Sequence, residues 1–172
     1  MKKAVIVING AGGVGKDTLC EIAAEHFKVE NISSITPIKE IAAMCGWDGR
    51  KDDKSRKFLA DLKRLSIEYN DYPTVWATEK YKEFLISDRE IMFVHIREPE
   101  EIAKFVSATG SEAKTLLIRG GERTKRSAYG NSADDGVENY SYDYCFDNSG
   151  TLCEATVGFV KLIEKILGNA RA

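Results

Sequence analysis

The sequence has few of the residues from which metal centres and disulfide frameworks are built. It contains two histidines and four cysteines, and no two cysteines form a C-x-x-C pair. Zinc sites usually take about four such ligands at short spacings, so none is expected here. We expect the cysteines to be reduced core residues of a cytoplasmic protein, with a disulfide framework as the minor alternative. They are Cys20, Cys45, Cys145 and Cys153.

Long apolar runs are also lacking. No segment reaches the roughly 18 apolar residues of a membrane span. Lys2 and Lys3 precede the run AVIVI, but its five residues are fewer than the roughly 7–15 of a signal-peptide core. We therefore expect no membrane partner and a cytoplasmic location.

The chain carries little net charge, has no internal repeat and contains no low-complexity segment. A net charge of −2 argues against a general nucleic-acid-binding surface, so no nucleic-acid partner is expected. The length of 172 residues fits a single domain spanning 1–172.

Hydrophobic patterns predict strands that alternate with helices. Short β-branched runs predict strands at 3–9, 90–96, 113–118 and 142–147. Helical spacing, helix-start prolines and terminal glycines predict helices at 15–27, 36–46, 53–70, 73 to 84 or 85, 98–110 and 151–167. The helix at 53–70 carries Phe58, Leu62, Leu65 and Tyr69 on one face. The alternation predicts an α/β fold, with a parallel sheet between two layers of helices.

A glycine-rich loop, GAGGVGKDT, connects the first predicted strand to the first predicted helix. Glycines let successive backbone N–H groups turn inward around an anion, and the helix start adds unpaired N–H donors. A lysine at this position reaches the outer phosphates of a triphosphate. The sequence therefore predicts a P-loop (Walker A) that binds ATP. Its residues are Gly10, Ala11, Gly12, Gly13, Val14, Gly15, Lys16, Asp17 and Thr18.

A dinucleotide-binding loop is the alternative interpretation of these glycines. Gly10, Gly12 and Gly15 have the spacing G-x-G-x-x-G. No acidic residue ends a second strand at the expected distance, however, and Lys16 would have no role.

The segment GKDT resembles the deoxynucleoside monophosphate kinases and other small P-loop kinases related to adenylate kinase. In these kinases the hydroxyl residue stands second after the lysine, as Thr18 does here. The segments TPIKEIA, VHIREPEE and YDYCFDNSGTL are similar to further parts of such kinases. The resemblance implies a five-stranded parallel sheet of order 2-3-1-4-5, with ATP and Mg²⁺ as cofactors. Lys16 and Asp17 are the catalytic candidates in this loop, and Asp17 is also the metal-binding candidate.

The resemblance also implies an acceptor-binding region. The helical segment 36–87 would bind the acceptor substrate. The substrate-binding candidates are Lys39 and Arg56 within this segment and Arg97 beyond it. Arg97 ends a predicted buried strand, where ligands of open α/β sheets gather. The structural alternatives are an ion pair between Arg97 and Glu101, and a solvated helix face at 56–64.

The polar segment 119–140 interrupts the alternation and is predicted to be a lid over the triphosphate. Arg123 and Arg126 are its catalytic candidates, and Arg119 is an ATP-binding candidate. A surface loop is the alternative. Asn148, at the turn after the last strand, would lie beside the adenine in the related kinases.

One position departs from the related kinases. They carry an aspartate two residues before the strand-end arginine, and His95 stands there in this sequence. The metal would then be held through Asp17 or Glu98, or the catalytic assignment would change. A core histidine with a hydrogen-bond partner is the structural alternative.

The predicted function is a small-molecule kinase that transfers the ATP γ-phosphoryl group to a nucleoside monophosphate, a deoxynucleotide in particular. Dephospho-CoA or another small substrate is an alternative acceptor, and a non-catalytic nucleotide-binding regulator is the alternative class. A GTPase is disfavoured because no Asn-Lys-x-Asp is present and the D-x-x-G at 147–150 comes too late. A monomer or homodimer is expected.

Overall fold

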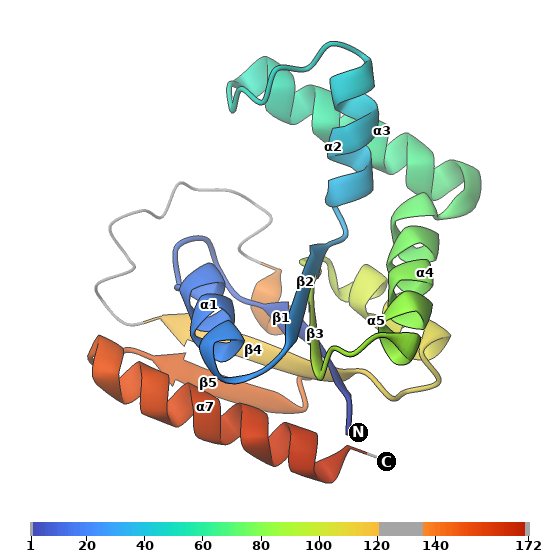
Figure 1. Ribbon diagram of the computed structural model, residues 1–172. Coiled ribbons are helices and arrows are strands. Elements are labelled where there is room, and N and C mark those ends of the chain that lie inside the picture. The colour runs from blue at the N-terminus through green and yellow to red at the C-terminus, as the bar shows by residue number, and fades with distance from the viewer. Residues whose placement is uncertain (1, 121–135, 171–172) are drawn as a thin grey trace.

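The computed structural model describes residues 2–120 and 136–170, which form a sheet with helices on both faces (Figure 1). The strands are β1 (Ala4–Asn9), β2 (Val29–Ser33), β3 (Ile91–His95), β4 (Lys114–Gly120) and β5 (Tyr144–Asn148). The helices are α1 (Lys16–His26), α2 (Thr36–Met44), α3 (Asp53–Asn70), α4 (Tyr72–Ile86), α5 (Pro99–Ala108) and α7 (Leu152–Asn169), with a short 3₁₀ helix, η2 (Val137–Asn139).

The five strands are all parallel and lie in the order β2-β3-β1-β4-β5. This is the order that the resemblance implied, and the fold class is confirmed. In the register, Ile8 of β1 pairs with His95 of β3 and with Leu116 of β4. The carboxyl ends of the strands, where ligands collect in open α/β sheets, therefore meet at one edge.

Two apolar layers hold the sheet between the helices. On one face Ile6, Ile8 and Phe93 pack with α1 and α7, and Phe93 stacks on Phe159 with ring centroids 6.3 Å apart. On the other face the alternate residues of β1 and β3 pack against α4 and α5, around Phe84 and Phe105. Because the central strands are covered on both faces, they have the continuous apolar sequences expected of a parallel sheet.

Strand β2 is the element that residue patterns did not predict. Its sequence, VENIS, contains three polar residues, and its side chains are half-buried or exposed. It lies at the edge of the sheet, where it pairs only with β3. Edge strands need little apolar sequence, so the five-residue segment gave no signal of its own.

Helices α2, α3 and α4 lie where helices were predicted at 36–46, 53–70 and 73 to 84 or 85. Figure 1 shows α2 and α3 standing beyond the carboxyl end of β2, away from the sheet, while α4 returns along its face. Asp52 caps α3 by accepting a hydrogen bond from the Ser55 backbone at 2.7 Å.

The predicted lid, 119–140, lies mostly outside the described residues. Arg119 and Gly120 end β4, and η2 follows at Val137–Asn139. No helix in the described part of the chain is long and apolar enough to span a membrane.

Candidate active site

The glycine-rich loop turns closely over the end of β4. Gly10 has a φ of 153°, and a Cβ there would lie 2.5 Å from the main-chain oxygen of Ile118. Gly15 has a φ of 89°, and a Cβ there would lie 2.6 Å from the Asn148 amide nitrogen. Only glycine fits these two positions without displacing its neighbours. The loop thus has the strand–loop–helix geometry of a phosphate cradle, and ATP phosphates fit it.

Lys16 begins α1 and lies across this loop. Its ammonium donates hydrogen bonds to the main-chain oxygens of Gly10 at 2.5 Å and Ala11 at 2.9 Å. These contacts hold the positive charge at the mouth of the loop, beside the N-terminal N–H groups of α1. An anionic phosphate in the cradle would compete for the ammonium with the two neutral carbonyl groups.

Asp17 and Thr18 are exposed in the first turn of α1 and line the same cleft as Lys16. A carboxylate and a hydroxyl are oxygen donors that suit Mg²⁺, which usually takes one or two carboxylates with substrate phosphates and waters. Residues 2–120 and 136–170 contain no cluster of three or more His, Cys, Asp or Glu side chains that could hold a metal. The residues present therefore fit Mg²⁺ only when it is shared with a bound nucleotide.

Asn9 holds the start of the loop, a role that the sequence analysis missed. Its side-chain oxygen accepts from the Gly10 N–H at 2.8 Å. Its side-chain nitrogen donates to the Arg97 carbonyl at 2.9 Å and to the Tyr142 hydroxyl at 2.8 Å. An asparagine that ends a buried strand was the available signal, because a buried amide needs specific partners.

Asn148 contacts the loop from β5. Its amide nitrogen donates to the Val14 carbonyl at 2.8 Å, which fixes the C-terminal half of the loop. The position is compatible with the predicted contact to ATP, and that contact remains a prediction.

A cleft of about 1010 Å³ runs from the loop to the α2–α3 segment. It brings together the predicted residues Lys16, Asp17, Thr18, Lys39, Arg56 and Arg97. It also contains Lys51, from the connection between α2 and α3, which the sequence analysis did not single out. Lysine in a polar loop carries no sequence signal that separates a ligand contact from a solvated charge.

Lys63 lies on the wall of this cleft and connects α3 to α5. Its side chain is 14% exposed, and its ammonium lies 2.9 Å from Glu98 and 2.8 Å from Glu101. Burial raises the pKa of Glu101, and Lys63 partly opposes that rise. Oε2 of Glu101 is buried without a hydrogen-bond partner among the described residues. A solvated face was the structural alternative for this part of α3, and Lys63 does not fit it.

His95 ends β3 on the cleft wall, at the position where the related kinases carry an aspartate. Its Nε2 lies 2.8 Å from Oδ1 of Asn31 and 3.8 Å from the Cys20 sulfur. Burial lowers the pKa of His95, so the ring stays neutral at pH 7. The hydrogen-bonded histidine that was the structural alternative is present, and it also lines the cleft.

Arg119 forms a paired contact at the end of β4. Its guanidinium donates to the two carboxylate oxygens of Glu138 at 3.0 Å and 2.6 Å, across the two ends of the predicted lid. This pairing raises the pKa of Arg119 and lowers that of Glu138. The predicted catalytic residues Arg123 and Arg126 lie outside the described residues.

The cysteines correct one expectation. Cys20 is buried, but Cys45, Cys145 and Cys153 are exposed rather than in the core. All four are free thiols, as expected. The sequence did not reveal this difference, since cysteine itself gives no indication of the face on which it lies.

No protein-family model matches this sequence, and no curated protein matches it. Solved structures do match over nearly the whole chain. A tunicamycin resistance protein of Deinococcus radiodurans has a TM-score of 0.56 at 13% identity, over 99% of this chain and 98% of its own. A shikimate kinase of Aquifex aeolicus has a TM-score of 0.52 at 10% identity, over 95% and 96%. A gluconokinase of Sinorhizobium meliloti has a TM-score of 0.50 at 16% identity, over 99% and 98%.

The sheet order, the loop geometry and these matches define the class of fold. The chain has the P-loop α/β fold that small-molecule kinases such as the shikimate kinase also have. At identities this low, the likeness concerns the fold and leaves the substrates to be inferred from this chain's own residues.

Proposed function

We propose that the protein is an ATP-dependent phosphotransferase whose acceptor is a nucleoside monophosphate. One observation carries the proposal: the phosphate-binding loop and a group of cationic side chains on the opposite wall share a single cleft. The loop side supplies Lys16, Asp17 and Thr18, and a donor triphosphate fits there. The acceptor side is formed by α2, α3 and the end of β3.

The charge of the acceptor side supports a phosphorylated acceptor. Lys39, Lys51 and Arg56 line it from the helical segment, and Arg97 lines it from the end of β3. A phosphate monoester carries nearly two negative charges at neutral pH, and arginine and lysine neutralise such groups. An uncharged polyol would leave these cations without an anionic partner in the substrate. The deoxynucleotide preference rests on the resemblance of GKDT and is the finer part of the proposal.

The reaction needs reactants to be positioned and charge to be neutralised. An oxygen of the acceptor phosphate attacks the γ-phosphorus, and the bond from that phosphorus to the bridging oxygen of ADP breaks. The products are a nucleoside diphosphate and ADP. Mg²⁺, when bound with the nucleotide, supplies charge neutralisation at the phosphates. Lys16 binds the outer phosphates, Arg97 and Arg56 orient the acceptor, and we assign Arg123 and Arg126 to the transferring group.

The test is an ADP-release assay over a panel of ribo- and deoxynucleoside monophosphates, with Mg²⁺ and with excess chelator. We expect turnover with one or a few monophosphates and none without the metal. Lys16→Ala should lower kcat/KM by about 100-fold or more while the protein stays folded. Lys80→Ala, on α4 and outside the cleft lining, is the matched control. Unchanged turnover in Lys16→Ala would exclude this active site.

The lid assignment has its own test. Neutralising Arg123 and Arg126 together should lower kcat more than it weakens ATP binding, because these residues are assigned to the transition state. Equal losses in both quantities would mean that they only hold ATP.

A kinase of a hydroxyl compound is the second candidate, and His95 favours it. A neutral imidazole on the cleft wall could accept the proton of an attacking hydroxyl, which a phosphate acceptor does not require. Adding hydroxyl acceptors and dephospho-CoA to the panel separates the two. Stabilisation by ATP without turnover of any acceptor would favour the non-catalytic regulator.

A further inference from the structure

Helix α3 leaves the apolar stripe predicted from its sequence largely uncovered. Phe58 is 37% exposed, Leu65 is 54% exposed and Tyr69 is 88% exposed. Leu62 is the only half-buried member of the stripe. Among its 18 residues the helix has no fully buried side chain. Three large apolar side chains in a row on one exposed helix are unusual for a surface without a partner.

The packed side of α3 faces another direction. The helix contacts α2 and α4, and Leu59, Ala60 and Lys63 line the cleft. The exposed members of the stripe, Phe58, Leu65 and Tyr69, do not line the cleft. In Figure 1 the helix stands at the far side of the molecule from α7, with its outer side clear of the other described elements.

A row of charges runs beside the stripe. Lys57, Asp61, Arg64 and Glu68 follow one another at spacings of four, three and four residues, which keeps them on one flank of the helix. Within the helix they pair as Lys57–Asp61 at 2.9 Å and Arg64–Glu68 at 2.8 Å. Along the helix, the row thus alternates cation, acid, cation, acid.

Read in the opposite direction, the row has an acid wherever the original has a cation, so two antiparallel copies are complementary in charge. When two copies of the row lie antiparallel, Lys57 faces Glu68 of the other copy, and Asp61 faces Arg64. When two copies lie parallel, the two rows fall on opposite flanks of the contact and do not face each other. In antiparallel helix pairs, equivalent flanks lie against each other, so the stripe and the row can be satisfied by the same twofold contact.

We propose that α3 is the interface of a homodimer in which two copies pair antiparallel about a twofold axis near Leu62. The apolar stripes form the centre of the contact, and the charged rows form its flank. The proposal does not depend on the identity of the substrate, because it uses the side of α3 that lies away from the cleft.

The experiment uses two complementary variants of the full chain and sedimentation equilibrium over a range of concentrations. The acidic variant is Lys57→Glu with Arg64→Glu, and the basic variant is Asp61→Lys with Glu68→Lys. We expect the wild type to dimerise, each variant alone to show a dimer Kd raised at least tenfold, and an equimolar mixture to form a heterodimer again. Leu65→Glu should weaken association without rescue by either variant.

Lys80→Glu with Glu83→Lys is the control, because it exchanges an exposed ion pair on α4. It should leave the dimer Kd unchanged. Circular dichroism of each variant checks that α3 remains folded after the intrahelical pairs are changed. A wild type that stays monomeric at all concentrations would overturn the proposal. A heterodimer that fails to form from the folded variants would also overturn it.

Discussion

The side chain of Asn9 joins the phosphate-binding loop to the strand end that carries Arg97. Its amide donates to the Arg97 carbonyl at 2.9 Å while its oxygen accepts from the Gly10 N–H at 2.8 Å. One residue at the end of β1 thereby connects the glycine-rich loop to the segment that carries Arg97, which is the proposed acceptor side of the cleft. Residues at strand ends can make such connections in a parallel sheet because the carboxyl ends of neighbouring strands lie at the same edge.

Asn9→Ala removes the partners of three polar groups in a buried environment. We expect a loss of about 2 kcal/mol in the free energy of unfolding, because unsatisfied buried groups cost about 1–3 kcal/mol. For a chain of this size the melting temperature should fall by about 4–8 °C. Asn70→Ala, at the exposed end of α3, is the control and should change neither quantity. A melting temperature equal to that of the wild type would show that these contacts contribute nothing net.

Two glycine substitutions separate the cost of a steric clash between the loop and β4 from the cost of a positive φ. Gly10 and Gly46 have φ values of 153° and 91°, but only Gly10 has atoms within 4 Å of the position of an added Cβ. Gly46→Ala should therefore cost about 1 kcal/mol from backbone strain alone. Gly10→Ala should cost about 3 kcal/mol or more and abolish ATP binding. Chemical denaturation and calorimetric titration with ATP measure the two effects; equal destabilisation would argue against the close contact with Ile118.

Much of the fold could be predicted from residue patterns because the central strands and the amphipathic helices carry strong periodic signals. Helix α3 begins and ends where its capping and periodicity predict, at Asp53 and Asn70. Strand β2 could not be found in this way, since an edge strand is held by its pairing with β3 rather than by apolar sequence.

The candidate site also contains residues that the sequence predicted and residues that it did not. The loop was predictable because phosphate binding requires glycines and a lysine at fixed spacing in one segment. Asn9, Lys51 and Lys63 were missed or left open because their roles arise from contacts with distant segments, such as the pairing of Lys63 with Glu101. Residue spacing alone does not contain these contacts.

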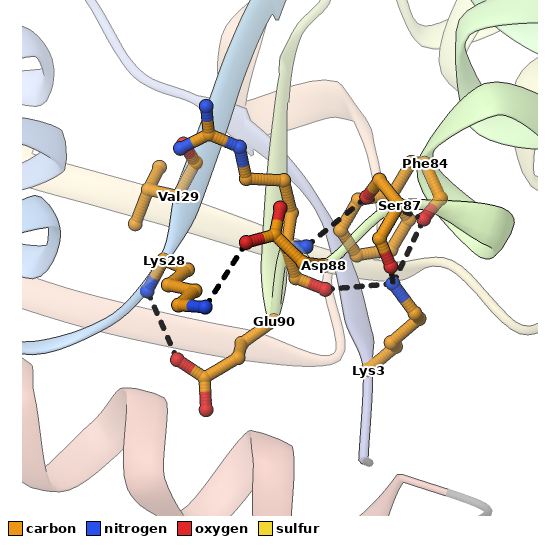
Figure 2. A network of polar contacts seen from close by, with 8 residues as sticks. Lys3, Lys28, Val29, Phe84, Ser87, Asp88 and Glu90 are labelled. Atoms are coloured by element: carbon orange, nitrogen blue, oxygen red, sulfur yellow. Dashed lines mark hydrogen bonds and ion pairs between the residues drawn. The ribbon is translucent and has the colours of Figure 1, made fainter.

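Lys3 connects the start of β1 to the end of α4 and to the connection between α4 and β3 (Figure 2). Its ammonium donates to the main-chain oxygens of Phe84, Ser87 and Arg89 at 2.9, 2.8 and 2.7 Å. It also lies 4.6 Å from the centre of the Phe84 ring. Lys3→Met should lower the free energy of unfolding by about 2 kcal/mol, since it removes the ammonium donor from the Ser87 and Arg89 carbonyls, whereas the Phe84 carbonyl still accepts from Ser87.

Lys2→Met is the matched control for this change. Lys2 donates to one exposed carbonyl, that of Gly168, and its loss should cost about 0.5 kcal/mol or less. Urea titrations of both variants give the comparison. Similar losses for the two lysines would show that the contacts in Figure 2 are not a specific stabilising network.

The thiols should divide into two classes. Burial, with the nearby charge of Asp17 as a smaller cause, raises the pKa of Cys20 to about 12. The thiolate is the reactive form, so Cys20 should not react at about pH 8 in the folded protein. Cys45, Cys145 and Cys153 are exposed and should react. Titration with an aromatic disulfide reagent should therefore find three thiols in the native protein and four after unfolding; four in the native protein would contradict the burial of Cys20.

Glu101 makes the stability of the protein depend on pH in a direction opposite to that of Asp61 and Asp88. Burial raises the pKa of Glu101 above its usual value of 4.5, so the folded state holds this proton more tightly than the unfolded state does. The contribution of Glu101 to stability is therefore greatest below the unfolded pKa and is lost as pH rises through the folded pKa. Asp61 and Asp88, with lowered pKa values, act in the opposite sense.

Glu101→Gln replaces the carboxylate with a neutral group of the same shape and isolates this effect. The variant should be at least as stable as the wild type at about pH 7, and its advantage should shrink as the pH falls to about 4. Urea unfolding of both proteins across this range gives the difference directly, which removes the contributions of the other carboxylates. Glu98→Gln, which changes the more exposed partner of Lys63, is the matched control for the loss of one carboxylate beside this lysine. If Glu101→Gln is instead the less stable protein at about pH 7, the attraction of Lys63 for the Glu101 carboxylate outweighs the cost of burying it.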